Sequence, residues 1–302
     1  MKAFGYVILS ILFRITIFLT RLLPERIVYC FCNRLSSLFI RSSRRYRRRI
    51  RKNLKIAFGP SCNNQYVEDI TRTLTKNIGL SCAETLISAT RNKDAIFDSI
   101  RLHGTENLDH ALSHGKGVLA VSAHLGNFTL IGAKMLREGY PFTTLVKEFK
   151  HPAIAKVTRK IQNEQGGRFI YMDPWSKAVR QILSSLKRNE IVCLVADEKR
   201  KHTGIVVEFF GEPALTATGP ALFSLKTGAP ILPIFIVRDD DHAHHIYIEP
   251  QLTYNQNGNP NEDIHTITLA YTTVIEKYIR RYPDQWFWIN NRWKTKRTRR
   301  SV

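Results

Sequence analysis

The sequence predicts an α/β domain, a central sheet with helices on both of its faces. Short apolar runs of strand length alternate with longer segments whose apolar residues recur every three to four positions. A length of 302 residues is enough for one domain with a large buried core. Hydrophobic residues make up 43% of the chain, with only 16 Gly and 12 Pro, which excludes a disordered, collagen-like or multi-pass membrane protein.

The elements follow from these patterns, taken along the chain. The strands are short continuous apolar runs, as expected where both faces of a sheet are covered. They are predicted over residues 117–123, 142–146, 169–172, 191–196, 231–237 and 244–248. Helices with three-to-four spacing are predicted over residues 67–89, 152–162, 176–187, 219–226 and 266–281, with another ending near Gly139. No internal repeat or Gly/Ser-rich linker divides the chain, so these elements form one domain.

The first 40 residues are predicted to be a separate, membrane-associated helical segment. Residues 3–23 are mostly apolar, and as a helix they would be about 31 Å long. Arg14 lies in the middle of this stretch, where it costs at least ~2.5 kcal/mol in a bilayer. The segment therefore either lies on the membrane as an interfacial anchor or makes one weak span in which Arg14 snorkels, and a buried core helix is the alternative. Residues 27–40 extend the apolar surface, and no signal-peptide cleavage site is seen.

The chain is strongly basic, and the charge is concentrated beside this segment. It has 46 Lys+Arg against 25 Asp+Glu, a net charge of +21. Nine basic residues fall in residues 41–55, where the domain of residues 41–302 begins, and six more lie in a basic tail at 292–300. A polybasic stretch next to an apolar helix is typical of binding to anionic headgroups, at ~1 kcal/mol per residue, although a solvated helix face is the alternative. No helix-turn-helix, RNP or KH pattern is present, so nucleic acid is not an expected partner.

The cysteines and most histidines give little sign of metal or disulfide chemistry. The five cysteines are odd in number and lack zinc spacing, so we expect free thiols in the core and a reducing compartment. The histidine-rich residues 241–245 are interpreted as a turn between strands, and no metal site is expected.

His124 is the best candidate for a catalytic residue. It directly follows the apolar run VLAVSA, and Gly126 and Asn127 then lead into the next helix. Ligands of α/β sheets bind at the carboxyl ends of strands, and an imidazole there can accept a proton from a hydroxyl at neutral pH. The alternative is a histidine that caps the helix or fills the core.

Other segments carry polar or aromatic residues at similar places. Asp197 and Glu198 end another predicted strand, and hydroxyls at 216 and 218 precede a helix start, where backbone N–H groups favour anions. Aromatic residues gather at 209–210 and 282–293, where core packing is an equally good explanation.

Taken in order, these segments resemble the bacterial lipid A biosynthesis acyltransferases, the lauroyl/myristoyl transferases of the lysophospholipid acyltransferase superfamily. The resemblance covers nearly the whole chain. It rests on RIRKNLKIAF at 49–58, AHLGNF at 123–128, the strand ending at Asp197, FFG at 209–211, TATGP at 216–220, TGAPILP at 227–233 and YPDQWFWINNRWK at 282–294. It implies a single glycerol-3-phosphate acyltransferase-like domain with a central mixed sheet.

The resemblance also implies a reaction and a place. A fatty acyl chain would move from acyl-ACP or acyl-CoA, as co-substrate and without a further cofactor, to a hydroxyl of a lipid A precursor or a related glycolipid or phospholipid. The enzyme would be monotopic or single-pass on the cytoplasmic face of the bacterial inner membrane and would serve lipopolysaccharide biosynthesis. His124 would act as general base, with a carboxylate orienting the imidazole, and backbone or basic groups would stabilise the oxyanion without an acyl-enzyme.

The sequence departs from the family pattern at the carboxylate. The family motif is His, four residues, then Asp or Glu, and Thr129 occupies that position here. Three alternatives stay open: Thr129 suffices, a remote acid (Glu148, Asp197 or Glu198) replaces it, or catalysis is lost and the chain is an anionic-lipid-binding or scaffold protein. A second departure is the family arginine near Gly166, for which other basic residues could substitute. The candidate substrate-binding residues are Gly126, Asn127, Lys147, Arg159, Arg168, Phe209, Phe210, Gly211, Thr216, Thr218, Gly219, Arg292, Trp293 and Lys294.

Overall fold

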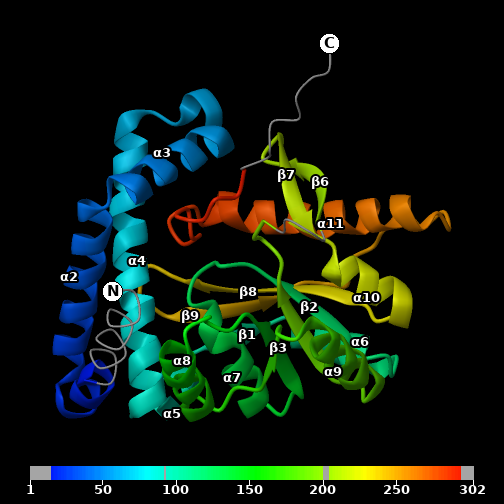
Figure 1. The fold of residues 1–302 in the computed structure, drawn as a ribbon, viewed down its shortest axis with the longest axis horizontal. Helices are drawn as coiled ribbons and strands as arrows, with labels where there is room; N and C mark the ends of the chain where they lie inside the picture. The colour runs from blue at the N-terminus through cyan, green and yellow to red at the C-terminus, as the bar shows by residue number, and fades with distance from the viewer. Residues whose placement is uncertain (1–14, 92, 200–203, 294–302) are drawn as a thin grey trace.

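The computed structural model describes residues 15–91, 93–199 and 204–293, and its centre is a seven-stranded mixed sheet (Figure 1). The strand order is β1-β9-β8-β2-β5-β3-β4, in which only β8 and β9 pair antiparallel. The strands are β1 (Arg101–His103), β2 (Val118–Ser122), β3 (Phe142–Val146), β4 (Phe169–Tyr171), β5 (Ile191–Val195), β8 (Ile231–Arg238) and β9 (His244–Ile248). The predicted α/β domain with a central mixed sheet is confirmed.

Helices cover both faces of this sheet, which explains the continuous apolar runs of its strands. All five residues of β2 are buried, and alternate ones belong to two different cores. One core includes residues of α9 (Trp175–Lys187), α10 (Gly219–Thr227) and α11 (Pro260–Arg281). The other includes residues of α5 (Lys93–Asp98), α6 (Thr105–Ser113) and α7 (Ile131–Arg137).

Some elements were missed or placed differently by the sequence patterns. The edge strand β1 has only three residues, and α5 and α6 are short, so their apolar patterns are too brief to detect. Residues 204–217 form a separate two-stranded antiparallel ribbon, β6 (Gly204–Phe209) and β7 (Glu212–Ala217). The ribbon turns at Phe210 and Gly211, both with positive φ.

A layer of N-terminal helices lies against α4 (Asn64–Thr90), on the side away from the sheet (Figure 1). Residues 15–22 are helical, and α2 (Glu25–Ser42) follows after Pro24. The buried side of α2 consists of Val28, Cys32, Ser36 and Ile40. Its other side exposes apolar side chains to solvent, namely Ile27, Phe31, Leu35, Leu38 and Phe39.

The predicted membrane helix is only partly visible in these residues. Residues 3–14 of that segment lie outside the described residues. Among the helices that the structure describes, none is both long and apolar enough to cross a bilayer. The exposed apolar residues of α2 lie on one side of the helix, in addition to the apolar residues on its buried side, which is the pattern of an amphipathic surface helix.

The polybasic stretch forms most of α3 (Arg44–Phe58), and its two sides have different roles. The buried side holds Ile50, Leu54 and Ala57, together with Asn53, which donates hydrogen bonds to the carbonyls of Trp288 and Asn290 (both 2.8 Å). The helix is therefore part of the domain core as well as a basic surface. All five cysteines are free thiols, although Cys30 and Cys82 are exposed and not in the core as expected.

The contact between α2 and α4 generates a stability prediction at Gly79. A Cβ at this position would lie 2.3 Å from Asn33 Oδ1 and 2.8 Å from the Asn33 Cα. Because the backbone of α2 cannot move without disturbing its packing, we expect Gly79→Ala to lower the free energy of unfolding by about 1–3 kcal/mol, despite the higher helix propensity of Ala. Chemical denaturation measures this.

The matched control is Gly219→Ala in α10, where a Cβ would meet only Leu194 Cδ2 at 3.6 Å. This is ordinary van der Waals contact, and we expect little change. An unfolding midpoint for Gly79→Ala that is equal to or above that of the wild type would contradict the close helix approach.

Candidate active site

His124 and Asp197 lie at one edge of the central sheet because each follows a strand. The strands β2 and β5 are parallel neighbours, with their last residues, Ser122 and Val195, opposite one another. The N–H of Ala196 donates to the carbonyl of Ser122 (2.9 Å), so the backbone hydrogen bonds between β2 and β5 continue up to the residue before Asp197. The carboxyl ends of parallel strands meet at the same edge, and two residues 73 positions apart in the chain are thereby brought into contact.

The Asp197 carboxylate is buried and hydrogen-bonded by three donors. His124 Nδ1 lies 2.7 Å from Oδ1, the backbone N–H of His124 donates to Oδ2 (2.9 Å), and the indole N–H of Trp286 donates to Oδ2 (2.7 Å). Burial of this side chain, which is only 3% exposed, acts to raise its pKa. The charge of His124 and these hydrogen bonds outweigh burial and hold the pKa of Asp197 below its ordinary value, so the carboxylate is ionised at neutral pH.

The second nitrogen of the His124 imidazole, Nε2, takes no part in the contact with Asp197 and lies on the side of Glu198. Burial acts to lower the pKa of His124, but Asp197 outweighs it through its charge and hydrogen bond, and Glu198 adds to this, so that the pKa is raised above 6.5. Glu198 Oε1 lies 3.8 Å from Nε2, and the Glu198 side chain is 47% exposed. The ring of Phe128 meets the imidazole edge to face at 4.8 Å. In the neutral tautomer in which Nδ1–H donates to Asp197, Nε2 carries a free lone pair, as a proton acceptor requires.

Thr129, which occupies the family's carboxylate position, does not contact the imidazole. Its hydroxyl donates to Asn127 Oδ1 (2.6 Å) and shares a hydrogen bond with Thr85 (3.0 Å) on α4. The chain turns at Gly126, with φ +55°, into a 3-10 turn at Phe128–Leu130 that carries Thr129. Of the carboxylates that the sequence offered as substitutes, Asp197 lies in contact.

Glu148, in the loop after β3, is paired with Arg159 of the helix that follows. It accepts two hydrogen bonds from Arg159, one from Nε and one from Nη2 (2.8 Å), and Arg159 stacks over the ring of Tyr171 at 4.6 Å. Glu148 and Arg159 therefore form an ion pair with one another, and Glu148 does not pair with the His124 imidazole in the described part of the chain.

The C-terminal motif closes the His124 loop from the other side. The N–H of Gly126 donates to the carbonyl of Gln285 (3.1 Å), and the N–H of Phe287 donates to the carbonyl of His124 (3.1 Å). Leu125 and Trp286 face one another as an isolated antiparallel bridge. Residues 285–287 thus act as a short strand beside residues 124–126. The AHLGNF and YPDQWFWINNRWK motifs are therefore in direct contact in the fold.

A second buried charge network supports the same loop, and the sequence did not reveal it. Glu84 of α4 accepts hydrogen bonds from both Nη1 and Nη2 of Arg238, the latter at 2.8 Å from Oε2. Its Oε2 also lies 3.0 Å from His244 Nε2. The amide of Asn127 donates to Glu84 as well (2.9 Å). Burial acts to raise the pKa of Glu84, but His244 and Arg238 lower it to about 2. The one signal in the sequence is that Glu84 and Arg238 interrupt apolar patterns.

Several predicted substrate-binding residues are buried in packing contacts. Arg292 lies over the ring of Phe209 at 4.6 Å and donates to the carbonyl of Leu215 (2.8 Å) and the hydroxyl of Thr216 (2.6 Å). Burial lowers the pKa of Arg292 to about 10. The indole of Trp293 donates to the carbonyl of Phe209 (3.1 Å). These contacts hold the β6–β7 ribbon in place, and they correct the expectation of a ligand surface there.

Of the remaining members of that set, Phe210 packs edge to face against Phe209 at 4.9 Å and lies 6.1 Å from the ring of Trp293. Phe210 and Thr218 are buried, Gly211 forms the turn of the ribbon, and Gly219 begins α10. Lys294 lies outside the described residues. Among the described residues, no ring contact joins Phe210 to His124, whose ring neighbours are Phe128 and Phe287.

The three basic candidates separate into two groups. Lys147 is exposed and directly follows β3, at the edge that carries His124, and Arg159 lies nearby on α8 (Pro152–Glu164). Arg168 instead precedes β4 and lies at the amino end of that strand. Its charge acts there on Glu190, whose pKa is lowered chiefly by Arg188 and also by Arg168. This placement corrects the expectation that Arg168 faces substrate.

Of the histidine-rich residues, 241–243 lie in the turn between β8 and β9, and His244 and His245 begin β9. His244 belongs to the Glu84 network, and His245 Nε2 lies 3.0 Å from Asp239. In the described part of the chain, no three His, Cys, Asp or Glu side chains gather in a way that could hold a metal ion.

An imidazole held by a buried carboxylate, at the carboxyl edge of a mixed α/β sheet, is the arrangement of a general base for acyl transfer. The chain belongs to the bacterial lipid A biosynthesis acyltransferase family, whose model matches residues 2–295. The resemblance seen in the sequence motifs is therefore confirmed.

The similar proteins act on more than one lipid. The chain is 24% identical over 250 residues to the lipid A biosynthesis palmitoleoyltransferase of Escherichia coli K12, covering 82% of this chain and 78% of that one. It is 22% identical over 280 residues to the lipid A biosynthesis lauroyltransferase of the same organism, covering 91% and 87%. It is 26% identical over 195 residues to the phosphatidylinositol mannoside acyltransferase of Mycobacterium tuberculosis. That match spans 63% of this chain and only 58% of the length of the mycobacterial protein.

The contact between His124 and Asp197 generates a prediction about titration. Asp197→Asn removes the charge that raises the pKa of His124, so we expect the pKa of His124 to fall. A histidine titration followed by NMR of the imidazole signals measures this. Thr129→Val is the control, because its hydroxyl contacts Asn127 and Thr85, and it should leave the His124 titration in place. An unchanged His124 pKa in Asp197→Asn would show that the pair is not formed in solution.

The Glu84 network generates a prediction about stability. Glu84→Gln leaves Arg238 buried without its charge partner, and we expect the free energy of unfolding to fall by about 3–5 kcal/mol. The pKa of Glu84 is about 2 in the folded chain, below its ordinary 4.5. Its contribution is therefore present above pH 4.5 and is lost as the pH falls towards 2. Denaturation at neutral pH and again in acid measures both, and a variant as stable as the wild type at pH 7 would exclude this role.

Proposed function

We propose that this chain is a membrane-associated O-acyltransferase. It transfers a fatty acyl chain from acyl-ACP or acyl-CoA to a hydroxyl of a lipid A precursor or a related glycolipid or phospholipid. Membership of the family supports this, as do relatives that transfer acyl groups to lipid A and to phosphatidylinositol mannoside. The observation that carries the proposal is the His124–Asp197 pair with Nε2 facing outward.

In the proposed reaction, His124 Nε2 accepts the proton of the acceptor hydroxyl as its oxygen attacks the thioester carbonyl. A new C–O bond forms, the C–S bond breaks, and the imidazolium returns its proton to the leaving thiolate. Asp197 stays ionised throughout and stabilises the imidazolium, as the carboxylate does in a hydrolase triad. Glu198, at 3.8 Å from Nε2, adds negative charge on the outer side. The acyl group passes directly to the acceptor, with no acyl-enzyme.

The N-terminal helices supply the membrane contact in this proposal. Residues 15–22 expose Ile15, Phe18, Leu19 and Leu22, and α2 exposes a further apolar side. The helix α3, which carries exposed cations, directly follows α2 in the chain, so apolar insertion of α2 and attraction to anionic lipids act together. We propose the cytoplasmic face of the bacterial inner membrane as the location, and the basic surface also suits an acidic acyl carrier protein.

The alternative of an inactive lipid-binding or scaffold protein rested on the missing carboxylate at position 129. The Asp197 contact supplies a carboxylate from elsewhere and argues against that alternative. Turnover separates the two proposals directly, because a scaffold protein transfers no acyl chain.

We expect His124→Ala to lower turnover about 10²–10⁴-fold, the usual contribution of a general base. Purified full-length protein is given acyl-ACP and lipid acceptors, and the products are followed by mass spectrometry. The matched control is His265→Ala, an exposed histidine on α11, which should keep wild-type turnover. Equal product from His124→Ala and the wild type would remove His124 from the mechanism, and no product from the wild type with any acceptor would favour the scaffold protein.

A further inference from the structure

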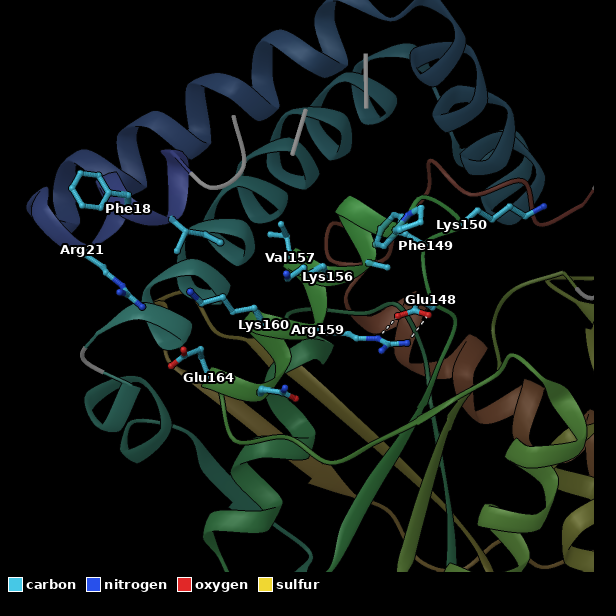
Figure 2. Close-up of a pocket in the computed structure, with 14 residues that line it drawn as sticks. Phe18, Arg21, Glu148, Phe149, Lys150, Lys156, Val157, Arg159, Lys160 and Glu164 are labelled. Carbon is cyan, nitrogen blue, oxygen red and sulfur yellow. Dashed lines mark hydrogen bonds and ion pairs between the residues drawn. The ribbon is translucent and has the colours of Figure 1, made fainter. Parts of the chain in front are cut away.

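A wide groove with a volume of about 1080 Å³ lies between helical residues 15–22, the loop after β3 and α8. Figure 2 shows side chains from all three segments facing this space. It is a different surface from the His124–Asp197 pair, and none of its lining residues belongs to that pair. We call it the cationic groove.

The cationic groove carries an excess of positive charge. Its lining includes the five cations Arg21, Lys150, Lys156, Arg159 and Lys160, and the two carboxylates Glu148 and Glu164. Glu148 is already paired with Arg159. The other four cations form no ion pair with any carboxylate in the described part of the chain.

Figure 2 shows Arg21, from the N-terminal helix, and Lys160, from α8, reaching towards the same space. Glu164 lines the same space, but the cations of the groove outnumber its carboxylates by five to two, so the potential there is positive. Such a potential favours a multivalent anion such as a phosphate group.

The groove also has an apolar wall, which a small soluble anion would not use. Phe18 and Phe149 line it and are 61% and 58% exposed, and Ile17 and Val157 lie behind them. Phe18 belongs to the same helix as the exposed Ile15, Leu19 and Leu22, so the wall is continuous with the apolar surface of that helix. A ligand that fits both parts has hydrocarbon chains and a phosphate group in one molecule.

The loop that lines the groove begins at the edge of the sheet that carries His124. Glu148 follows β3, and β3 pairs in parallel with β5, whose end leads to Asp197. A lipid bound in the groove would therefore contact a loop that starts at the same edge as the imidazole–carboxylate pair.

We infer that the cationic groove binds the phosphate-bearing headgroup of the acceptor lipid, with Arg21, Lys156 and Lys160 around the phosphate and Phe18 and Phe149 against the acyl chains. This inference rests on the proposed function, since it names the class of acceptor: a membrane lipid that carries a phosphate group.

The test measures binding without turnover. Full-length protein is titrated with neutral detergent micelles that contain phosphatidic acid, and the dissociation constant is compared between the wild type and Lys156→Ala/Lys160→Ala. We expect about tenfold weaker binding or more in the double variant. The matched control is Lys177→Ala/Lys187→Ala on α9, which removes the same charge from an exposed surface outside the groove and should bind like the wild type.

Competition identifies the source of the phosphate. Inorganic phosphate and coenzyme A are added at millimolar concentration, and neither should displace the lipid. Displacement by inorganic phosphate would show a free-phosphate site, and displacement by coenzyme A would show a site for the donor; either result overturns the inference. Equal affinity of the groove variant and its control would overturn it as well. If the lipid binds as expected but the protein transfers no acyl chain, the proposed function is wrong and the binding site stands. If the protein transfers acyl chains but the groove variant binds like its control, the binding site is wrong and the proposed function stands.

Discussion

The buried Asp197 carboxylate is the interaction on which the site depends, because a charge removed from water must be compensated within the protein. Three donors compensate it: the His124 imidazole, the His124 backbone and the Trp286 indole. They come from the end of β2 and from the C-terminal motif, while Asp197 itself follows β5. Loss of any one donor leaves the buried carboxylate with fewer hydrogen bonds. The hydrogen bonds that stabilise the folded chain at Asp197 are therefore the same ones that hold the His124 imidazole in position. The position of His124 is thus fixed by an electrostatic constraint and not only by the strand that precedes it.

The same constraint explains how far the sequence could predict the site. Strands that are buried on both faces leave continuous apolar runs, and these placed β2, β5 and the position of His124 correctly. The partner of His124 could not be derived from spacing, because a sheet register joins residues 73 positions apart and nothing local records it. Asp197 was available only as one of three acids. Glu84 was not found at all, since a single acid in a helix gives no sign that Arg238 and His244 surround it.

The basic character of the chain has two physical origins in the fold. Part of α3 is a structural helix, whose Asn53 and Arg49 hold the carbonyls of the C-terminal motif. Its outward cations, and Arg21, Lys150, Lys156 and Lys160 of the cationic groove, form no ion pair with a carboxylate in the described part of the chain, whereas Arg159 pairs with Glu148. Net charge alone could not separate these two groups, because both consist of Lys and Arg on helices. Their separation required knowledge of which side of each helix faces the core.

The pairing of residues 285–287 with the His124 loop has a consequence for biosynthesis. The strands β2 and β5 are complete long before Trp286 has been made by the ribosome. Until then Asp197 lacks its indole donor, and the loop that carries His124 lacks the strand beside it. A nascent or shortened chain that ends before Trp286 therefore contains His124 and Asp197 but lacks the indole donor and the strand that hold them. The support of the imidazole–carboxylate pair is complete only once residues 285–287 have been synthesised.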